Sequence, residues 1–222
     1  MQRDNHSYTN GKKKTFSSAQ NSTKVATLHF YFYFCKQNFA KTKTIMIHNE
    51  REIRRTQVIE AAKQMMTAAR TAPKAKGEDL LEILLVTNED IKTLSDKLHA
   101  MGEEMSRGGM MRDAINILSA DAIMLIGTRE LPMGLNCAYC GAKTCESRAE
   151  GTPCAMNLVD VGIALGSACA TAADLRLDTR VMYSAGYAAR ALGWMPECTC
   201  IIAIPVSASA KNPFFDRKSM KK

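Results

Sequence analysis

Four cysteines lie within an eighteen-residue stretch and constrain the chain more than any other feature. Two, four and eight residues separate them in turn: Cys137, Cys140, Cys145 and Cys154. Four thiolates on so short a segment can saturate a tetrahedral metal ion or hold one iron–sulfur cluster. Gly141 follows the second cysteine and can adopt the positive φ that a tight ligand loop often needs. The spacing therefore predicts a ligand loop at residues 136–155.

Three kinds of site are compatible with these cysteines. Zinc modules usually carry two Cys-x2-Cys pairs, or one such pair with two histidines. This chain has one pair, and no histidine follows His99. Disulfides form in oxidising compartments, and the sequence shows no secretory signal. The spacing favours a [4Fe–4S] cluster and leaves structural zinc and disulfides as alternatives.

The residues before the fourth cysteine predict the start of a helix. Thr152 is a suitable N-cap, and Pro153 is common in the first turn. Cys154 would then lie at a helix N-terminus, where the macrodipole favours a thiolate and a negatively charged cluster.

The net charge of +8 is concentrated in the first 45 residues. Residues 1–45 carry +7 and eight of the fourteen aromatic side chains, whereas the rest of the chain carries only +1. A nearly neutral body predicts no nucleic-acid partner. We expect residues 1–45 to be a non-native or disordered extension, with translation starting at Met46, and residues 46–222 to form a single domain.

The spacing of apolar residues predicts helices and strands that follow one another along the body. Helices are expected over residues 50–70, 88–105, 110–118, 154–173 and 185–192. Strands are expected over residues 80–86, 121–127, 181–183 and 199–206. Such a pattern indicates an α/β or α+β fold, with helices packed on a sheet.

Residues 154–173 are expected to form a long, buried central helix. Asp160 is their only charged residue, and the stretch is long enough for a membrane span. Its alanine-rich composition favours a core helix, so we predict no membrane partner. Gly162 and Gly166 create a small face for close contact, either within the domain or across a homodimer.

The other cysteines and the histidines give no indication of a catalytic residue. Cys169, Cys198 and Cys200 are expected to be buried side chains, and His99 a surface residue. Glycine-rich nucleotide motifs and hydrolase triads are absent from the sequence. Cysteines of reduced type without an export signal predict a cytoplasmic protein.

The cysteine motif resembles the [4Fe–4S] domain of electron-transport-complex subunits and corrinoid iron–sulfur proteins. In those families the fourth cysteine usually lies farther downstream than Cys154 does here. Residues 46–217 resemble a bacterial and archaeal family described as containing a ferredoxin domain. That resemblance rests on the cysteine motif and on residues 70–75, 180–186 and 211–217.

The layout is also similar to that of the flavin-dependent nitroreductases. This resemblance implies a mixed sheet packed with helices, a homodimer built on the central helix, and FMN as a cofactor. The usual Arg-Ser-x-Arg phosphate segment is not matched, although basic residues lie in the corresponding regions: Arg51, Arg54, Arg55, Lys74 and Lys76.

Together these features predict an iron–sulfur protein with an electron-transfer role and an electron-carrier protein as partner. One alternative is a nitroreductase-like flavin oxidoreductase that also carries the cluster. The other is a non-catalytic protein in which zinc stabilises the fold.

Overall fold

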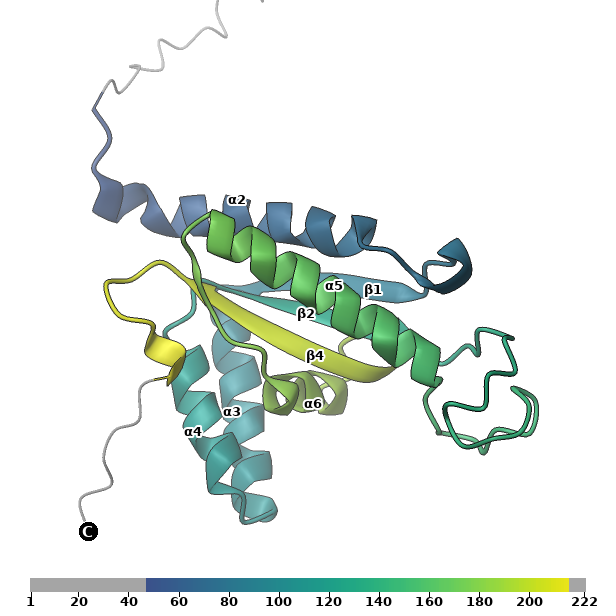
Figure 1. Ribbon diagram of the computed structural model, residues 1–222. Coiled ribbons are helices and arrows are strands. Elements are labelled where there is room, and N and C mark those ends of the chain that lie inside the picture. The colour runs from purple at the N-terminus through teal and green to yellow at the C-terminus, as the bar shows by residue number, and fades with distance from the viewer. Residues whose placement is uncertain (1–46, 216–222) are drawn as a thin grey trace, which may run out of the picture. The chain divides into compact units, whose positions relative to one another are not determined.

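The structure is a computed structural model that describes residues 47–215 (Figure 1). The predictions made for residues 1–45 lie outside this range. The helices are α2 (Glu50–Thr71), α3 (Glu89–Glu104), α4 (Gly108–Ile117), α5 (Ala155–Asp174) and α6 (Tyr183–Ala191). The strands are β1 (Leu81–Thr87), β2 (Ala122–Arg129), β3 (Asp178–Thr179) and β4 (Cys198–Ser207). Two 3₁₀ turns, η1 (Ala75–Gly77) and η2 (Pro213–Phe215), complete the elements.

The four strands form one sheet in the order β1-β2-β4-β3, and the predicted α+β class is confirmed. Every strand pair that the structure describes is antiparallel, so the expectation of a mixed sheet was wrong in strand direction. The long β1–β2 connection contains two helices, α3 and α4, that pack against each other. Because such a pair leads the chain out and back, β2 begins beside the end of β1 and runs antiparallel to it.

Strand β2 lies inside the sheet and is buried on both faces. Its first seven residues, 122–128, are all buried, which explains the continuous apolar run in the sequence. Ile123 and Leu125 belong to the core on one face, and Met124 and Ile126 to the core on the other. The alternation follows from the two-residue period of a strand.

The two faces of the sheet are covered by different helices (Figure 1). Helices α2 and α5 pack together on one face, and α3, α4 and α6 cover the other. By length and composition, α5 is the one helix within residues 47–215 that could span a membrane. It packs the face that includes Val161, Ala164 and Ala168 into the core between the helix and the sheet. Its opposite face is open, with Val159 48% and Ile163 41% exposed, so the helix is buried on one side rather than all round.

The strand predicted at residues 181–183 is reduced to one bridge. Met182 exchanges backbone hydrogen bonds with Ala203 of β4, and helix α6 starts at the next residue, Tyr183. Strand β3 lies earlier and is only two residues long. The apolar run Val181–Tyr183 suits a strand locally, but packing of α6 against β4 determines its structure. The outer edge of β4 therefore has no strand partner along residues 199–202 in the described chain.

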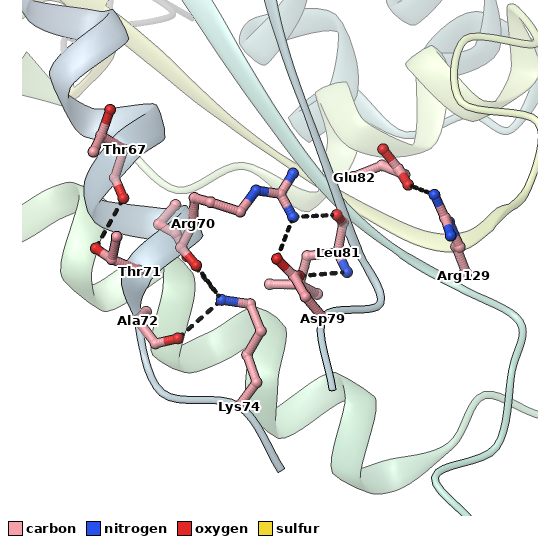
Figure 2. Close-up of polar contacts among 10 residues, drawn as sticks. Thr67, Arg70, Thr71, Ala72, Lys74, Asp79, Leu81, Glu82 and Arg129 are labelled. Atoms are coloured by element: carbon pink, nitrogen blue, oxygen red, sulfur yellow. Dashed lines mark hydrogen bonds and ion pairs between the residues drawn. The ribbon is translucent and has the colours of Figure 1, made fainter. Parts of the chain in front are cut away.

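The turn from α2 into β1 is held by a group of polar contacts (Figure 2). Lys74 Nζ donates to the carbonyl oxygens of Arg70 (2.5 Å) and Ala72 (2.9 Å), which lie at the end of α2. The Arg70 guanidinium bonds Asp79 Oδ2 (2.6 Å) and the Leu81 carbonyl oxygen (2.8 Å). These bonds satisfy carbonyl groups that a helix end leaves unpaired and fix where β1 begins.

Asp79→Asn should destabilise the protein in a pH-dependent way. Burial opposes ionisation, but the Arg70 guanidinium and the Leu81 N–H hold the pKa of Asp79 below its ordinary value of 3.8. A lowered folded-state pKa adds stability that is present above pH 3.8 and is lost as the pH falls through the folded value. Because the pair is partly exposed, we expect a loss of about 0.5 kcal/mol at pH 7.

Urea unfolding at pH 7 and at low pH measures this loss. The difference between wild type and Asp79→Asn should shrink at the lower pH, where both side chains are neutral. Asp96→Asn, which breaks an exposed pair with Lys92, is the matched control. An equal difference at both pH values would contradict the role given to Asp79.

Candidate metal centre

The four predicted ligands lie on one loop that joins β2 to α5. Figure 1 shows this loop, residues 130–154, projecting beyond the ends of the two elements. Cys137, Cys140 and Cys145 are partly exposed, whereas Cys154 is buried. The loop thus presents three accessible thiols and one that belongs to the folded body.

Local hydrogen bonds shape the outer part of the loop. The Cys145 N–H donates to Asn136 Oδ1 (2.7 Å), and the Asn136 N–H donates to Cys145 Sγ (3.3 Å). This reciprocal pair encloses Cys137 and Cys140. Asn136, Ala138 and Gly141 all have positive φ, and Gly141 reaches 87°, as its sequence position led us to expect. Bonds from backbone N–H to sulfur are typical of loops that hold thiolates.

Cys154 is itself the N-cap of α5, and the prediction that Thr152 caps the helix was wrong. The chain enters the helix later than the Thr-Pro signal suggests, so the sulfur lies directly at the helix start. Burial opposes ionisation, but the N–H groups of Met133, Asn157 and Met156 and the Arg148 charge hold the pKa of the Cys154 thiol below its ordinary value. Cys154 is therefore prepared to act as a thiolate ligand.

Two buried side chains of α5 hold the segments next to Cys154. Asn157 Nδ2 donates to the Leu131 carbonyl oxygen (2.6 Å), and the Asp160 carboxylate accepts the Ala75 N–H (3.0 Å). Cys154, Asn157 and Asp160 are three residues apart, so they share one face of the helix start. Asn157 Oδ1 is buried and finds no partner among the described residues, which typically costs about 1–3 kcal/mol.

Lys76 provides a second attachment for the loop start that Asn157 holds. Its Nζ donates to the Met133 carbonyl oxygen (3.2 Å) and also pairs with Glu78 (2.7 Å). Met133 is itself only 2% exposed. The start of the cysteine loop is thus held by contacts from η1 and from α5.

The thiols do not form an assembled metal site in this structure. Within residues 47–215 no three cysteine, histidine or acidic side chains lie close enough together to bind one ion, and the cysteines there form no disulfide. Four free thiols on one loop still match the donor set of a cysteine-ligated cluster. The outer loop would have to close towards Cys154 to bring these donors round one centre.

The other cysteines of the described chain have a different environment. Burial raises the pKa of Cys169 and Cys200, and raises that of Cys198 to about 11. These thiols stay protonated at neutral pH. Cys198 is buried as predicted, whereas Cys169 and Cys200 are only partly buried, so the prediction of burial was wrong for those two.

Three of the basic residues considered for a flavin phosphate make contacts within the protein. Lys74 caps α2, Lys76 holds the loop start, and Arg54 pairs with Glu50 one helical turn away. This part of the described structure therefore shows no preformed phosphate site built from those three side chains.

Comparison with known proteins shows which family the chain belongs to. A protein of Archaeoglobus fulgidus, described as an uncharacterized protein, is 40% identical over 189 residues, covering 79% of this chain and all of the relative. Residues 150–217 match the family described as "uncharacterized protein containing a ferredoxin domain". The chain belongs to this family. The ferredoxin-domain description supports a redox role.

Two solved structures are similar in fold to this member of the ferredoxin-domain family. The nitroreductase CinD from Lactococcus lactis, solved with nicotinic acid, superposes with a TM-score of 0.50 at 14% identity, covering 75% of this chain and 82% of CinD. A nitroreductase with bound FMN from Bacteroides fragilis gives 0.49 at 11% identity, covering 73% and 83%. The predicted nitroreductase-like fold is confirmed.

Sequence reasoning missed the residues that hold the cysteine loop in this family member. Lys76 and Asp160 were visible as a loop lysine and as the only charge of an apolar helix, but their partners were not. Asn136 and Asn157 gave a weaker signal, since each lies within three residues of a cysteine.

Proposed function

We propose that the protein is a redox protein in which Cys137, Cys140, Cys145 and Cys154 hold one [4Fe–4S] cluster. When bound, such a cluster takes up and releases single electrons. The observation that supports this most strongly is Cys154, a buried thiol at the start of α5 that backbone N–H groups favour as a thiolate. Membership of the ferredoxin-domain family supports the same role.

The residues around the loop would influence how the cluster behaves. Backbone N–H groups near sulfur stabilise the more negative, reduced state, and solvent access does likewise. The Met133, Met156 and Asn157 amides would act on one ligand, and the Asn136 amide on Cys145. Lys143 and Arg148 on the same loop are balanced by Glu146 and Glu150, so side-chain charge around the cysteines is close to neutral.

Anaerobic purification of the full chain followed by iron, sulfide and zinc analysis tests this proposal. We expect a brown protein with about four irons and four sulfides per chain and a broad absorption band near ~400 nm. A colourless protein with one zinc per chain would refute the redox proposal and favour a structural metal site.

A flavin-dependent oxidoreductase that also carries the cluster is the second candidate. Its support is the nitroreductase-like fold, which the chain shares with CinD. The same preparation decides, since bound FMN adds structured bands near ~450 nm and is released on denaturation. Absence of extractable flavin after purification with added FMN would refute this second candidate and leave the cluster as the only proposed cofactor.

Two partners follow from the proposed role. An electron-carrier protein would exchange electrons with the cluster. A second copy of the chain would cover the open face of α5, where a Cβ added at Gly162 or Gly166 would meet no atom of the described chain within 4 Å beyond its own helix turn. Sedimentation of the full chain should then show a dimer, and a monomer at micromolar concentration would contradict this.

We propose the cytoplasm as location, because free cysteines persist in reducing compartments.

A further inference from the structure

Two contacts hold the short segment that leads into the cysteine loop, and a third joins their supports. Lys76 of η1 holds the Met133 carbonyl oxygen at 3.2 Å, and Asn157 of α5 holds the Leu131 carbonyl oxygen at 2.6 Å. The third contact joins the two supports to each other, because the Ala75 N–H donates to Asp160 at 3.0 Å. Residues 131–133 are therefore clamped between η1 and α5.

The clamp is formed by segments that are far apart in sequence. Lys76 and Met133 are 57 residues apart, Asn157 and Leu131 are 26 apart, and Ala75 and Asp160 are 85 apart. Contacts of this range do not follow from local loop geometry. They make the position of Met133 relative to Cys154 a property of the folded body.

Within residues 47–215, the outer loop has no comparable attachment at its cysteines. The hydrogen bonds to Cys145 come from Asn136, nine residues away in the same loop. Cys137, Cys140 and Cys145 are partly exposed, whereas Met133 and Cys154 are buried. Cys154 thus belongs to the folded body, whereas the hydrogen bonds that the structure shows for the outer cysteines stay within their own loop.

We propose that Lys76 and Asn157 are positioning residues that hold residues 131–133, at the start of the cysteine loop, against the start of α5 where Cys154 lies. Cys154 then serves as the fixed ligand onto which the outer three cysteines close. This inference rests on the proposed cluster and adds to it an order of assembly and a set of supporting residues. Partners that orient a ligand from outside are expected to change metal affinity by about 10–100-fold when they are removed.

Lys76 permits a variant that separates positioning from stability. Its φ is 56°, a conformation that glycine adopts without steric cost. Lys76→Gly removes the side chain that reaches Met133 and also relieves the backbone. The variant should keep or raise its melting temperature and yet bind the cluster less well. A residue that mattered only for folding would change both in the same direction.

Lys74 provides the matched control, since it lies in the same turn and bonds the end of α2 instead. Lys74→Met should lower the melting temperature and leave cluster retention unchanged. Lys76→Arg keeps a donor at the end of a long side chain and should restore most of the retention.

The experiment has one readout with the cluster and one without it. With the cluster, iron release from Lys76→Gly to a ferrous chelator should be about tenfold faster than from wild type, and the midpoint potential should fall. Without it, hydrogen exchange at residues 131–134 of the metal-free full chain should be faster in Lys76→Gly and unchanged in Lys74→Met.

Equal iron release and equal exchange in wild type and Lys76→Gly would overturn the inference. Failure of wild type to bind any cluster would refute the proposed function instead. The hydrogen-exchange comparison would still decide whether the clamp exists, so the two failures can be distinguished.

Discussion

Gly186→Ala is expected to destabilise the protein by roughly 3 kcal/mol or more, at the upper end of what overpacking costs. A Cβ at this position of α6 would lie 2.0 Å from the Ile201 carbonyl oxygen, 2.5 Å from its carbon and 2.9 Å from Ile202 Cα. These are backbone atoms of β4, so no side-chain rotation can relieve the clash. The helix would have to move away from the strand and open the core that they share.

Urea or thermal unfolding measures this effect, with Gly109→Ala in α4 as the control. A Cβ at Gly109 meets no atom within 4 Å, so that variant should be neutral or slightly more stable. If Gly186→Ala had the same urea midpoint of unfolding as wild type, the close packing described for α6 on β4 would be contradicted.

Cys154→Ala is expected to abolish cluster binding, with iron falling from about four per chain to below about one. The variant removes the one ligand that is already held by the folded body. The outer cysteines would then have no fixed thiolate to close onto. Because the side chain is small, we expect the fold to lose only about 1 kcal/mol.

Iron and sulfide analysis after anaerobic reconstitution measures this loss, and circular dichroism confirms that the variant is folded. Cys169→Ala is the matched control, since Cys169 lies on the same helix and should be dispensable for iron. Full iron content and an unchanged spectrum in Cys154→Ala would show that the fourth ligand is another group.

The helices and strands were largely predictable because their signals are local. The expected helix over residues 50–70 is α2 at Glu50–Thr71, and the strand over 80–86 is β1 at Leu81–Thr87. Apolar periodicity carries that information within ten or twenty residues. The prediction of a strand at 181–183 was wrong. The structure of this segment depends on how α6 packs against β4, and no local sequence pattern encodes that packing.

The candidate site was predictable in its ligand residues and not in its supports. Cysteine spacing is visible in the sequence, whereas Lys76 and Asn157 bind backbone carbonyl oxygens. Every residue has such an oxygen, so the sequence cannot indicate which one is chosen. The same limit applies to Asp160, whose partner is the amide of Ala75.

The brevity of β3 also bears on aggregation. Ala203 directs its N–H and C=O outward to Met182, so by alternation Ile201 directs its own groups to the same outer edge. An unpaired edge of this kind is a template on which another chain can add a strand. Close packing of Gly186 on the Ile201 oxygen places α6 over that template. Helix α6 therefore covers the β4 edge at Ile201, where another chain could otherwise add a strand, in addition to filling the core.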